Sequence, residues 1–153
     1  MEIPDTVRSL ALDLRSAFPR SPRETLAGYV LAARIVDKAR AALLDQLGEY
    51  HYALNPSLDT VFFDFTGLTP EALKNFVATG ADDEAVAAWI TANARERPRI
   101  EIIKWNNWLR YLRPSEAPEH AQEYMEDYLP AHLPKNRPVY VWFDIYDIEE
   151  GRI

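Results

Sequence analysis

Apolar side chains follow a helical rhythm over much of the first third of the chain. Within residues 22–47 they recur at intervals of three, four and seven residues, which places them on one face of a helix. The residues of this apolar stripe are Tyr29, Ala33, Val36, Leu43 and Leu47. The pattern predicts a long helix with one buried face.

Local signals at both ends agree with this helix. Ser21 is a typical N-cap, Pro22 suits the first helical position, and Glu24 completes a capping box. Gly48 is a suitable left-handed stop. Gly28 lies inside the expected helix, where glycine costs about 1 kcal/mol relative to alanine. We therefore expect another element to approach Gly28 closely.

Further helix starts are predicted where a capping residue precedes an apolar pattern, or where a proline ends the preceding helix. These starts follow Thr69, Asp82, Pro98 and Ser115. The helix from Thr69 is expected to stop at Gly80, and the helix capped by Ser115 is expected to reach about Leu129.

Two stretches fit either a helix or a strand. Residues 60–66 and 139–148 are rich in β-branched and aromatic residues, which is typical of strands. However, Gly67 follows the first stretch as a suitable helix stop, and three aromatic side chains of the second stretch cluster at helical spacing. We favour a helix for both.

Together these elements predict a mostly α fold. We expect a single compact bundle of about five to seven helices over residues 1–153, with an N-terminal tail of about residues 1–18. Short irregular or extended pieces are expected near residues 49–66 and 139–148. A length of 153 residues suits one domain that is large enough to bury its own core.

Composition and charge narrow the classes of partner. The chain has no cysteine, which excludes disulfides, thiolate nucleophiles and cysteine metal sites. Its net charge of −7 opposes attraction to nucleic acid or to an anionic membrane. The longest uncharged stretch, Ala85–Ala94, has about half the length of a membrane span. We expect a cytoplasmic protein with neither nucleic acid nor membrane as partner.

Several motifs together resemble a known family. They begin with Pro19–Glu24, Gly28-Tyr29 and Asp37–Arg40, and continue with Gly48–Tyr52, Leu58-Asp59, Phe62–Gly67 and Trp142–Asp144. This combination is similar to the bacterial family called domain of unknown function 5069, and it extends over nearly the whole chain. The resemblance implies a bacterial cytoplasmic setting and brings no activity, cofactor or catalytic residue with it.

The chain departs from that family in one place. Where members read Tyr-His-Phe-Asn-Cys-Pro-Leu-Asp, residues 50–59 are two residues longer and lack the cysteine. Thiol chemistry at that position is therefore excluded in this chain.

His51 is the first candidate for chemistry. In an extended segment Glu49 and His51 share one side, and a carboxylate beside an imidazole favours a general base or a metal ligand. Asp64 is a further candidate acid if it converges on the same pocket. The alternative is structural: His51 only satisfies a backbone carbonyl after the long helix.

Four charges interrupt the apolar middle of the long helix. Arg34 and Lys38 are one turn apart, so their cationic groups are placed to bind a phosphate or a carboxylate. Asp37 lies within reach of Arg34 and of Arg40, which offers a plain ion-pair explanation instead. We predict Arg34, Lys38 and Asp37 as ligand-binding residues, and a site in which Arg34 and Lys38 are joined by Glu49 and His51.

Other mechanisms lack their motifs. The sequence has no Gly-x-Ser-x-Gly elbow, no glycine-rich phosphate loop and no His-Glu-x-x-His. His120 with Glu116 and Glu123 has metal-ligand spacing, but no second histidine cluster completes the set, and we expect a solvated acidic face. We therefore predict no metal and no cofactor.

Two functional hypotheses follow. The first is a non-catalytic helical domain that binds a small acidic ligand or a protein partner. The second is a small enzyme in which His51 and Glu49 form the acid–base group, while Arg34 and Lys38 hold an anionic substrate. Convergence of these residues and Asp64 on one concave pocket would favour the enzyme or a ligand site.

Overall fold

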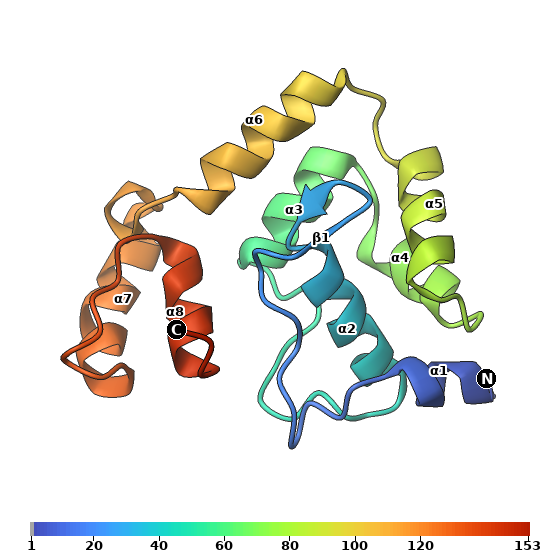
Figure 1. The fold of residues 1–153 in the computed structure, drawn as a ribbon, viewed down its shortest axis with the longest axis horizontal. Helices are drawn as coiled ribbons and strands as arrows, with labels where there is room; N and C mark the ends of the chain where they lie inside the picture. Colours follow the sequence, from blue (N-terminus) through green and yellow to red (C-terminus); the bar gives the residue numbers. More distant parts are fainter. Residues whose placement is uncertain (1) are drawn as a thin grey trace. The chain divides into compact units, whose positions relative to one another are not determined.

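The computed structural model describes residues 2–153, and more than half of the chain is helical (Figure 1). The described residues form eight α-helices, one short 3₁₀ helix and one two-stranded antiparallel sheet. This confirms the mostly α fold, with one helix more than the upper end of the expected range. The chain divides into two compact units, one extending to Pro98 and the other spanning Arg99–Ile153.

Helix α2 lies at the centre of the first unit. It contacts α1, α4 and β1, and α4 packs in turn against α5. The elements of this unit are α1 (Asp5–Leu10), β1 (Thr25–Leu26), β2 (Tyr29–Val30), α2 (Ala32–Leu43), α3 (Leu58–Thr66), α4 (Pro70–Val77) and α5 (Asp83–Asn93). Helix α1 lies within the segment that we expected to be an N-terminal tail.

The prediction of a long helix over residues 22–47 is wrong for the first third of that range. A β-hairpin precedes α2, with Thr25 opposite Val30 and Leu26 opposite Tyr29. The two loop residues, Ala27 and Gly28, have φ values of 55° and 85°, and positive φ at both positions matches the right-handed twist of a hairpin. Gly28 is therefore a residue of the hairpin turn, and not a helical residue that another element approaches closely.

Ser21 does not cap a helix. Its Oγ accepts a hydrogen bond of 3.1 Å from Arg23 N, and its carbonyl accepts one of 3.0 Å from Glu24 N. Because serine and proline favour turns as well as helix starts, the residues that suggested a capping box form a turn before the hairpin. At the other end α2 already stops at Leu43, although Gly48 has the left-handed φ of 60° that we expected there.

The first ambiguous stretch is helix α3, as we favoured. Ser57 caps it by accepting a hydrogen bond from Asp59 N, and Gly67 ends it with φ 75° while donating from its N–H to Phe63 O. The preceding residues 49–57 form no regular element. The irregular piece is thus confined to the connection between α2 and α3.

The next two helices begin as the sequence predicts. Thr69 Oγ1 accepts from Ala72 N at the start of α4, and Asp82 Oδ1 accepts from Ala85 N at the start of α5. Both contacts satisfy backbone N–H groups that lack partners within the helix. The second of these caps brings Asp83 into the first turn of α5.

The core of the first unit gathers around α2. Its fully buried members come from every helix of the unit and from β2, and the rings of Tyr29 and Phe62 meet edge to face at 5.8 Å. They include Val7, Val30, Ile35, Val36, Phe62, Leu73, Val77, Val86 and Ile90. Ten consecutive residues of α2, Ala32–Ala41, are buried, so this helix has no solvent-facing side in its middle.

The second unit has its own buried side chains. Its elements are α6 (Arg99–Arg110), the 3₁₀ helix η1 (Pro114–Glu116), α7 (Glu119–His132) and α8 (Trp142–Glu149). Helix α8 confirms the preference for a helix in the second ambiguous stretch. Its core side chains include Leu109, Leu112, Leu133, Phe143 and Ile145.

Ser115 does not cap a helix either. It lies inside η1, and α7 begins after Pro118 without a side-chain cap and continues to His132. Proline fixes φ and restricts the residue before it, so two prolines four residues apart break the expected start into a 3₁₀ turn and a helix. None of the helices of residues 2–153 has both the length and the apolar character needed to cross a membrane.

Candidate ligand-binding cleft on helix α2

Four charged side chains of α2 are buried. Arg34, Asp37, Lys38 and Arg40 are only 3% to 9% exposed. A buried charge is costly unless it is paired and hydrogen-bonded, so each requires a partner from another segment of the unit. These partners divide the charges of α2 into two clusters.

The first cluster is a closed ion pair. Lys38 Nζ donates to both carboxylate oxygens of Asp59 at 2.7 Å, and Ala53 N donates to Asp59 Oδ2 at 2.8 Å. Ser57 places Asp59 here, because its cap starts α3 and puts Asp59 in the first turn. Both residues of the pair are buried. We call this pair the closed pair.

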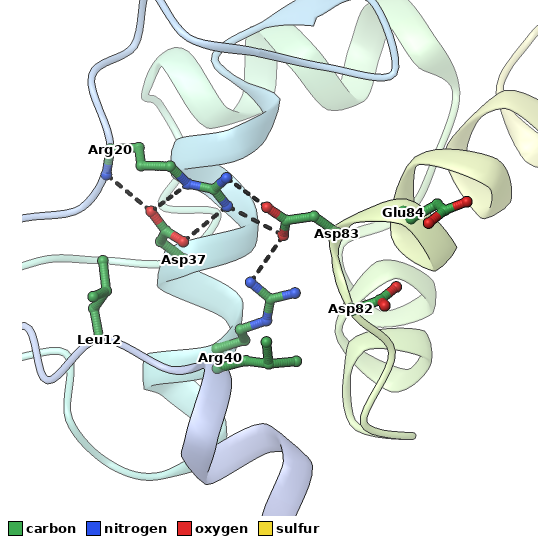
Figure 2. A pocket seen from close by; sticks show the side chains of 8 residues that line it. Leu12, Arg20, Asp37, Arg40, Asp82, Asp83 and Glu84 are labelled. Atoms are coloured by element: carbon green, nitrogen blue, oxygen red, sulfur yellow. Dashed lines mark hydrogen bonds and ion pairs between the residues drawn. The ribbon is translucent and has the colours of Figure 1, made fainter.

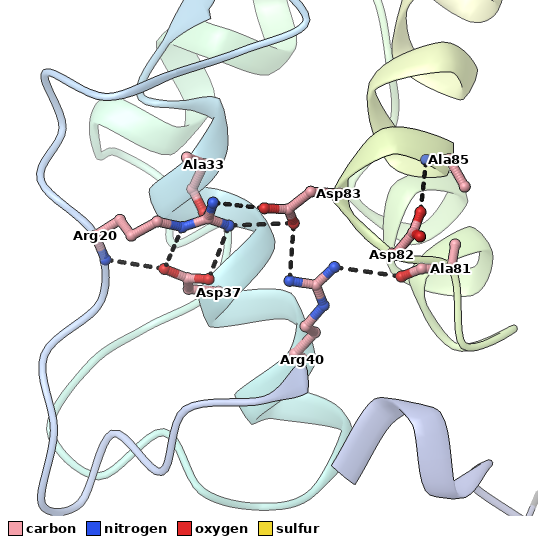
Figure 3. A network of polar contacts seen from close by, with 8 residues as sticks. All are labelled: Arg20, Ala33, Asp37, Arg40, Ala81, Asp82, Asp83 and Ala85. Carbon is pink, nitrogen blue, oxygen red and sulfur yellow. Dashed lines mark hydrogen bonds and ion pairs between the residues drawn. The ribbon is translucent and has the colours of Figure 1, made fainter. Parts of the chain in front are cut away.

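The second cluster begins with a fork between Arg20 and Asp37. Arg20 Nε and Nη2 each donate to one oxygen of Asp37 at 3.0 Å, and Arg20 N donates to Asp37 Oδ2 at 2.9 Å (Figure 3). Arg34 supports this arrangement, because its Nη1 donates to Arg20 O at 3.1 Å. The two side-chain contacts hold the guanidinium of Arg20 in a fixed orientation, and the third fixes its backbone to the same buried carboxylate.

Asp83 joins the arginines of this cluster. It comes from the first turn of α5 and accepts from Arg20 Nη1 at 2.6 Å, and its other oxygen lies 3.0 Å from Arg40 Nη1. Arg40 Nη2 donates in addition to Ala81 O at 3.2 Å (Figure 3). We call the four residues Arg20, Asp37, Arg40 and Asp83 the open cluster, because the Asp83 side chain is 41% exposed.

The charges of the open cluster stabilise one another. Burial alone raises the pKa of the Asp83 carboxyl, but hydrogen bonds and charges from Arg20 and Arg40 outweigh it and hold that pKa below its usual value. Burial likewise opposes the charge of Arg20, whereas its hydrogen bonds to Asp37 and Asp83 raise its pKa. Arg20 and Asp83 therefore each stabilise the charged form of the other.

A cleft of about 530 Å³ opens beside the open cluster. All four members line it, together with Leu10, Leu12, Asp82 and Glu84. Figure 2 shows Asp83 pointing towards Arg20 and Arg40, whereas the carboxylates of Asp82 and Glu84 point away from Arg20. Asp83 is thus the carboxylate of the cleft lining that contacts both arginines.

The predicted binding residues of α2 lie in different surroundings. Asp37 belongs to the open cluster, and Lys38 belongs to the closed pair. Arg34 contacts Arg20 O and lies over the ring of Tyr50, with its guanidinium carbon 5.6 Å from the ring centroid. Only Asp37 lines the cleft itself.

The predicted acid–base residues are at the surface. Glu49 and His51 are exposed in the connection between α2 and α3, and Asp64 is an exposed residue of α3. Among the described contacts, none links these three side chains to Arg34 or Lys38. Within residues 2–153, no group of three or more histidine, aspartate or glutamate side chains is placed to hold a metal ion.

A comparison of the sequence with known proteins identifies the family of this chain. The family model described as "Domain of unknown function (DUF5069)" matches residues 16–152. The chain belongs to this family. The match covers nearly the whole chain and confirms the resemblance seen in the sequence, whereas no curated protein matches it.

In this DUF5069 domain, sequence reasoning did not find the partners in the cleft. Neither Arg20 nor Asp83 is among the residues that the sequence predicts to bind a ligand. Arg20 is 17 residues from Asp37 and 63 residues from Asp83, so no local spacing joins them. The sequence contains one signal, which is the presence of several charged residues in an apolar helix. Such charges require partners when they are buried, but the pattern does not indicate which residues those partners are.

Proposed function

We propose that the protein is a non-catalytic binding module for a small molecule that carries a carboxylate or a phosphate. In this proposal the anionic group of the ligand enters the cleft and takes the place of Asp83 on Arg20 and Arg40. One observation carries the proposal: two arginines meet on a single carboxylate, and that carboxylate is partly exposed at the cleft.

The arginines suit this role. A guanidinium presents its N–H groups in a planar fork that matches carboxylate and phosphate oxygens. Asp37 occupies one edge of Arg20, so the edge that faces Asp83 is already oriented. A binding group that is held in place loses less conformational freedom when a ligand arrives.

The lining of the cleft supports binding over catalysis. Its side chains are leucines, arginines and carboxylates, and the two arginines hold the pKa of Asp83 below its usual value. General-base catalysis works best with a group whose pKa lies near the working pH, and the pKa of Asp83 is shifted in the opposite direction. The alternative in which His51 and Glu49 form an acid–base pair stays a prediction.

The test compares two variants from the same turn of α5. Asp83→Asn removes the charge that competes for the arginines, whereas Glu84→Gln removes an equal charge that points away from Arg20. We expect Asp83→Asn to bind 4-methylpentanoate or inorganic phosphate about threefold to tenfold more tightly than the wild type, because partly exposed ion pairs contribute about 1 kcal/mol. Calorimetric titration measures the affinity. Ligand at 100 times its Kd adds about 2.7 kcal/mol of stability, which is visible as a thermal shift.

A third variant tests the arginine fork. Arg40→Lys keeps the positive charge but loses the planar pair of donors, so we expect weaker binding of the same anions. Circular dichroism checks that each variant folds. The proposal is wrong if neither anion binds the wild type or Asp83→Asn, or if Asp83→Asn and Glu84→Gln change the affinity equally.

A further inference from the structure

The lining of the cleft also indicates which anion fits best. Resting on the proposed function, we propose that the ligand is a zwitterionic α-amino acid with a small apolar side chain. Its carboxylate binds Arg20 and Arg40, its ammonium group binds the displaced Asp83, and its side chain lies against Leu10 and Leu12.

The charge balance of the cleft is the first argument. Two arginines face four carboxylates in its lining, of which Asp37 is fully committed to Arg20. A ligand with only negative charge displaces Asp83 and leaves it without a cation, next to Asp82 and Glu84 in the same turn. Repulsion between these like charges opposes such a ligand.

An α-amino acid avoids this cost. Its ammonium and carboxylate groups are bonded to the same carbon. One molecule therefore provides a new cationic partner for Asp83 and a new anionic partner for the two arginines. Arg20 and Arg40 exchange the carboxylate of Asp83 for that of the ligand, and Asp83 exchanges its contacts with two guanidinium groups for an ammonium contact. The phosphate dianion brings more negative charge and no cation, so it is the poorer ligand in this cleft.

The apolar part of the lining is the second argument. Leu10 ends α1 and Leu12 follows it, and both are large apolar side chains that remain exposed at the cleft. Covering them with an apolar group removes hydrocarbon surface from water on both sides of the contact. An aliphatic side chain therefore complements this wall, while the charged groups of the ligand face the open cluster.

The test compares leucine with 4-methylpentanoate, which is leucine without its amino group. We expect the wild type to bind leucine at least about threefold more tightly, in line with one partly exposed ion pair. Asp83→Asn reverses the order, because it loses the partner of the ammonium group and frees the arginines for the simple carboxylate. Glu84→Gln is the matched control and keeps the order of the wild type. Calorimetric titration at one ionic strength gives all six affinities.

The outcomes separate this inference from the proposed function. If 4-methylpentanoate or phosphate binds the wild type as tightly as leucine, or if Asp83→Asn strengthens both organic ligands alike, the amino-acid inference is wrong while the binding function stands. If none of these ligands binds the wild type or Asp83→Asn, both are wrong. Glycine carries the same two charges without a side chain, and binding equal to that of leucine would contradict the role of Leu10 and Leu12.

Discussion

The closed pair and the open cluster both pair buried charges of α2 with residues of other segments, but they differ in their exposure to solvent. Lys38 and Asp59 are both buried, and each oxygen of the carboxylate is committed to Lys38. The open cluster ends instead in Asp83, whose side chain is 41% exposed beside a cleft. Buried charge alone therefore does not mark a binding site. A partner that solvent and solutes can reach is also required.

Breaking the closed pair is expected to have the largest effect. Lys38→Met leaves Asp59 as an unpaired buried charge, which typically costs about 3–5 kcal/mol of unfolding free energy. The double variant Lys38→Met with Asp59→Asn removes both charges and keeps an oxygen for Ala53 N, so it should be more stable than Lys38→Met alone. Urea unfolding followed by circular dichroism measures both. Equal stability of the single and double variants would show that the pair is not closed to solvent.

Asp37→Asn should have the next largest effect. The substitution weakens the three contacts with Arg20, and the loss of hydrogen bonds to a charged group costs about 2 kcal/mol. Asp13→Asn is the matched control, because Asp13 holds Arg15 in the same fork geometry at the surface. Urea unfolding should show a much smaller change for Asp13→Asn. Similar changes in both variants would remove the distinction between a buried orienting carboxylate and a surface ion pair.

The pH dependence of Asp83 should be the smallest effect on stability. Its pKa is lowered in the folded state, so its contribution is fully present above the unfolded pKa of about 3.9 and is lost as the pH falls through the folded value. The stability difference between the wild type and Asp83→Asn should be constant from pH 7 to about pH 5 and shrink below about pH 4. Because the group is partly exposed, we expect this difference to be at most about 1 kcal/mol. Urea unfolding at several pH values measures it, and a difference that grows on acidification would contradict the ion pairs.

The helix starts that sequence predicts correctly are those with local chemistry. Thr69 and Asp82 bind backbone N–H groups three residues away, so the whole interaction lies within one turn. The hairpin at residues 25–30 was missed for the opposite reason. Ala27-Gly28 lacks the Asn-Gly or Asp-Gly signal of a tight hairpin, and Ser21-Pro22 is compatible with a turn as well as a helix.

The candidate site shows the same limit. Helical spacing correctly drew attention to the charges of α2, because such charges in an apolar helix are unusual. Their partners are Arg20, Asp59 and Asp83, which approach from a turn, from α3 and from α5 and are 17, 21 and 43 residues away from Asp37, Lys38 and Arg40 respectively. Only tertiary packing brings these segments together. The sequence pattern therefore identifies the α2 member of each ion pair but not its partner.

The proposed exchange of Asp83 for a ligand can be tested directly at the arginines. In ¹⁵N-labelled protein, the guanidinium Nη–H signals of Arg20 and Arg40 report on their contacts with Asp83, and those of Arg15, which is paired with Asp13, are an internal control. During titration with leucine we expect the signals of Arg20 and Arg40 to shift to saturation with one common Kd, while those of Arg15 stay unchanged. Signals of Arg20 and Arg40 that do not move, or that move no more than those of Arg15, would contradict ligand binding in place of Asp83.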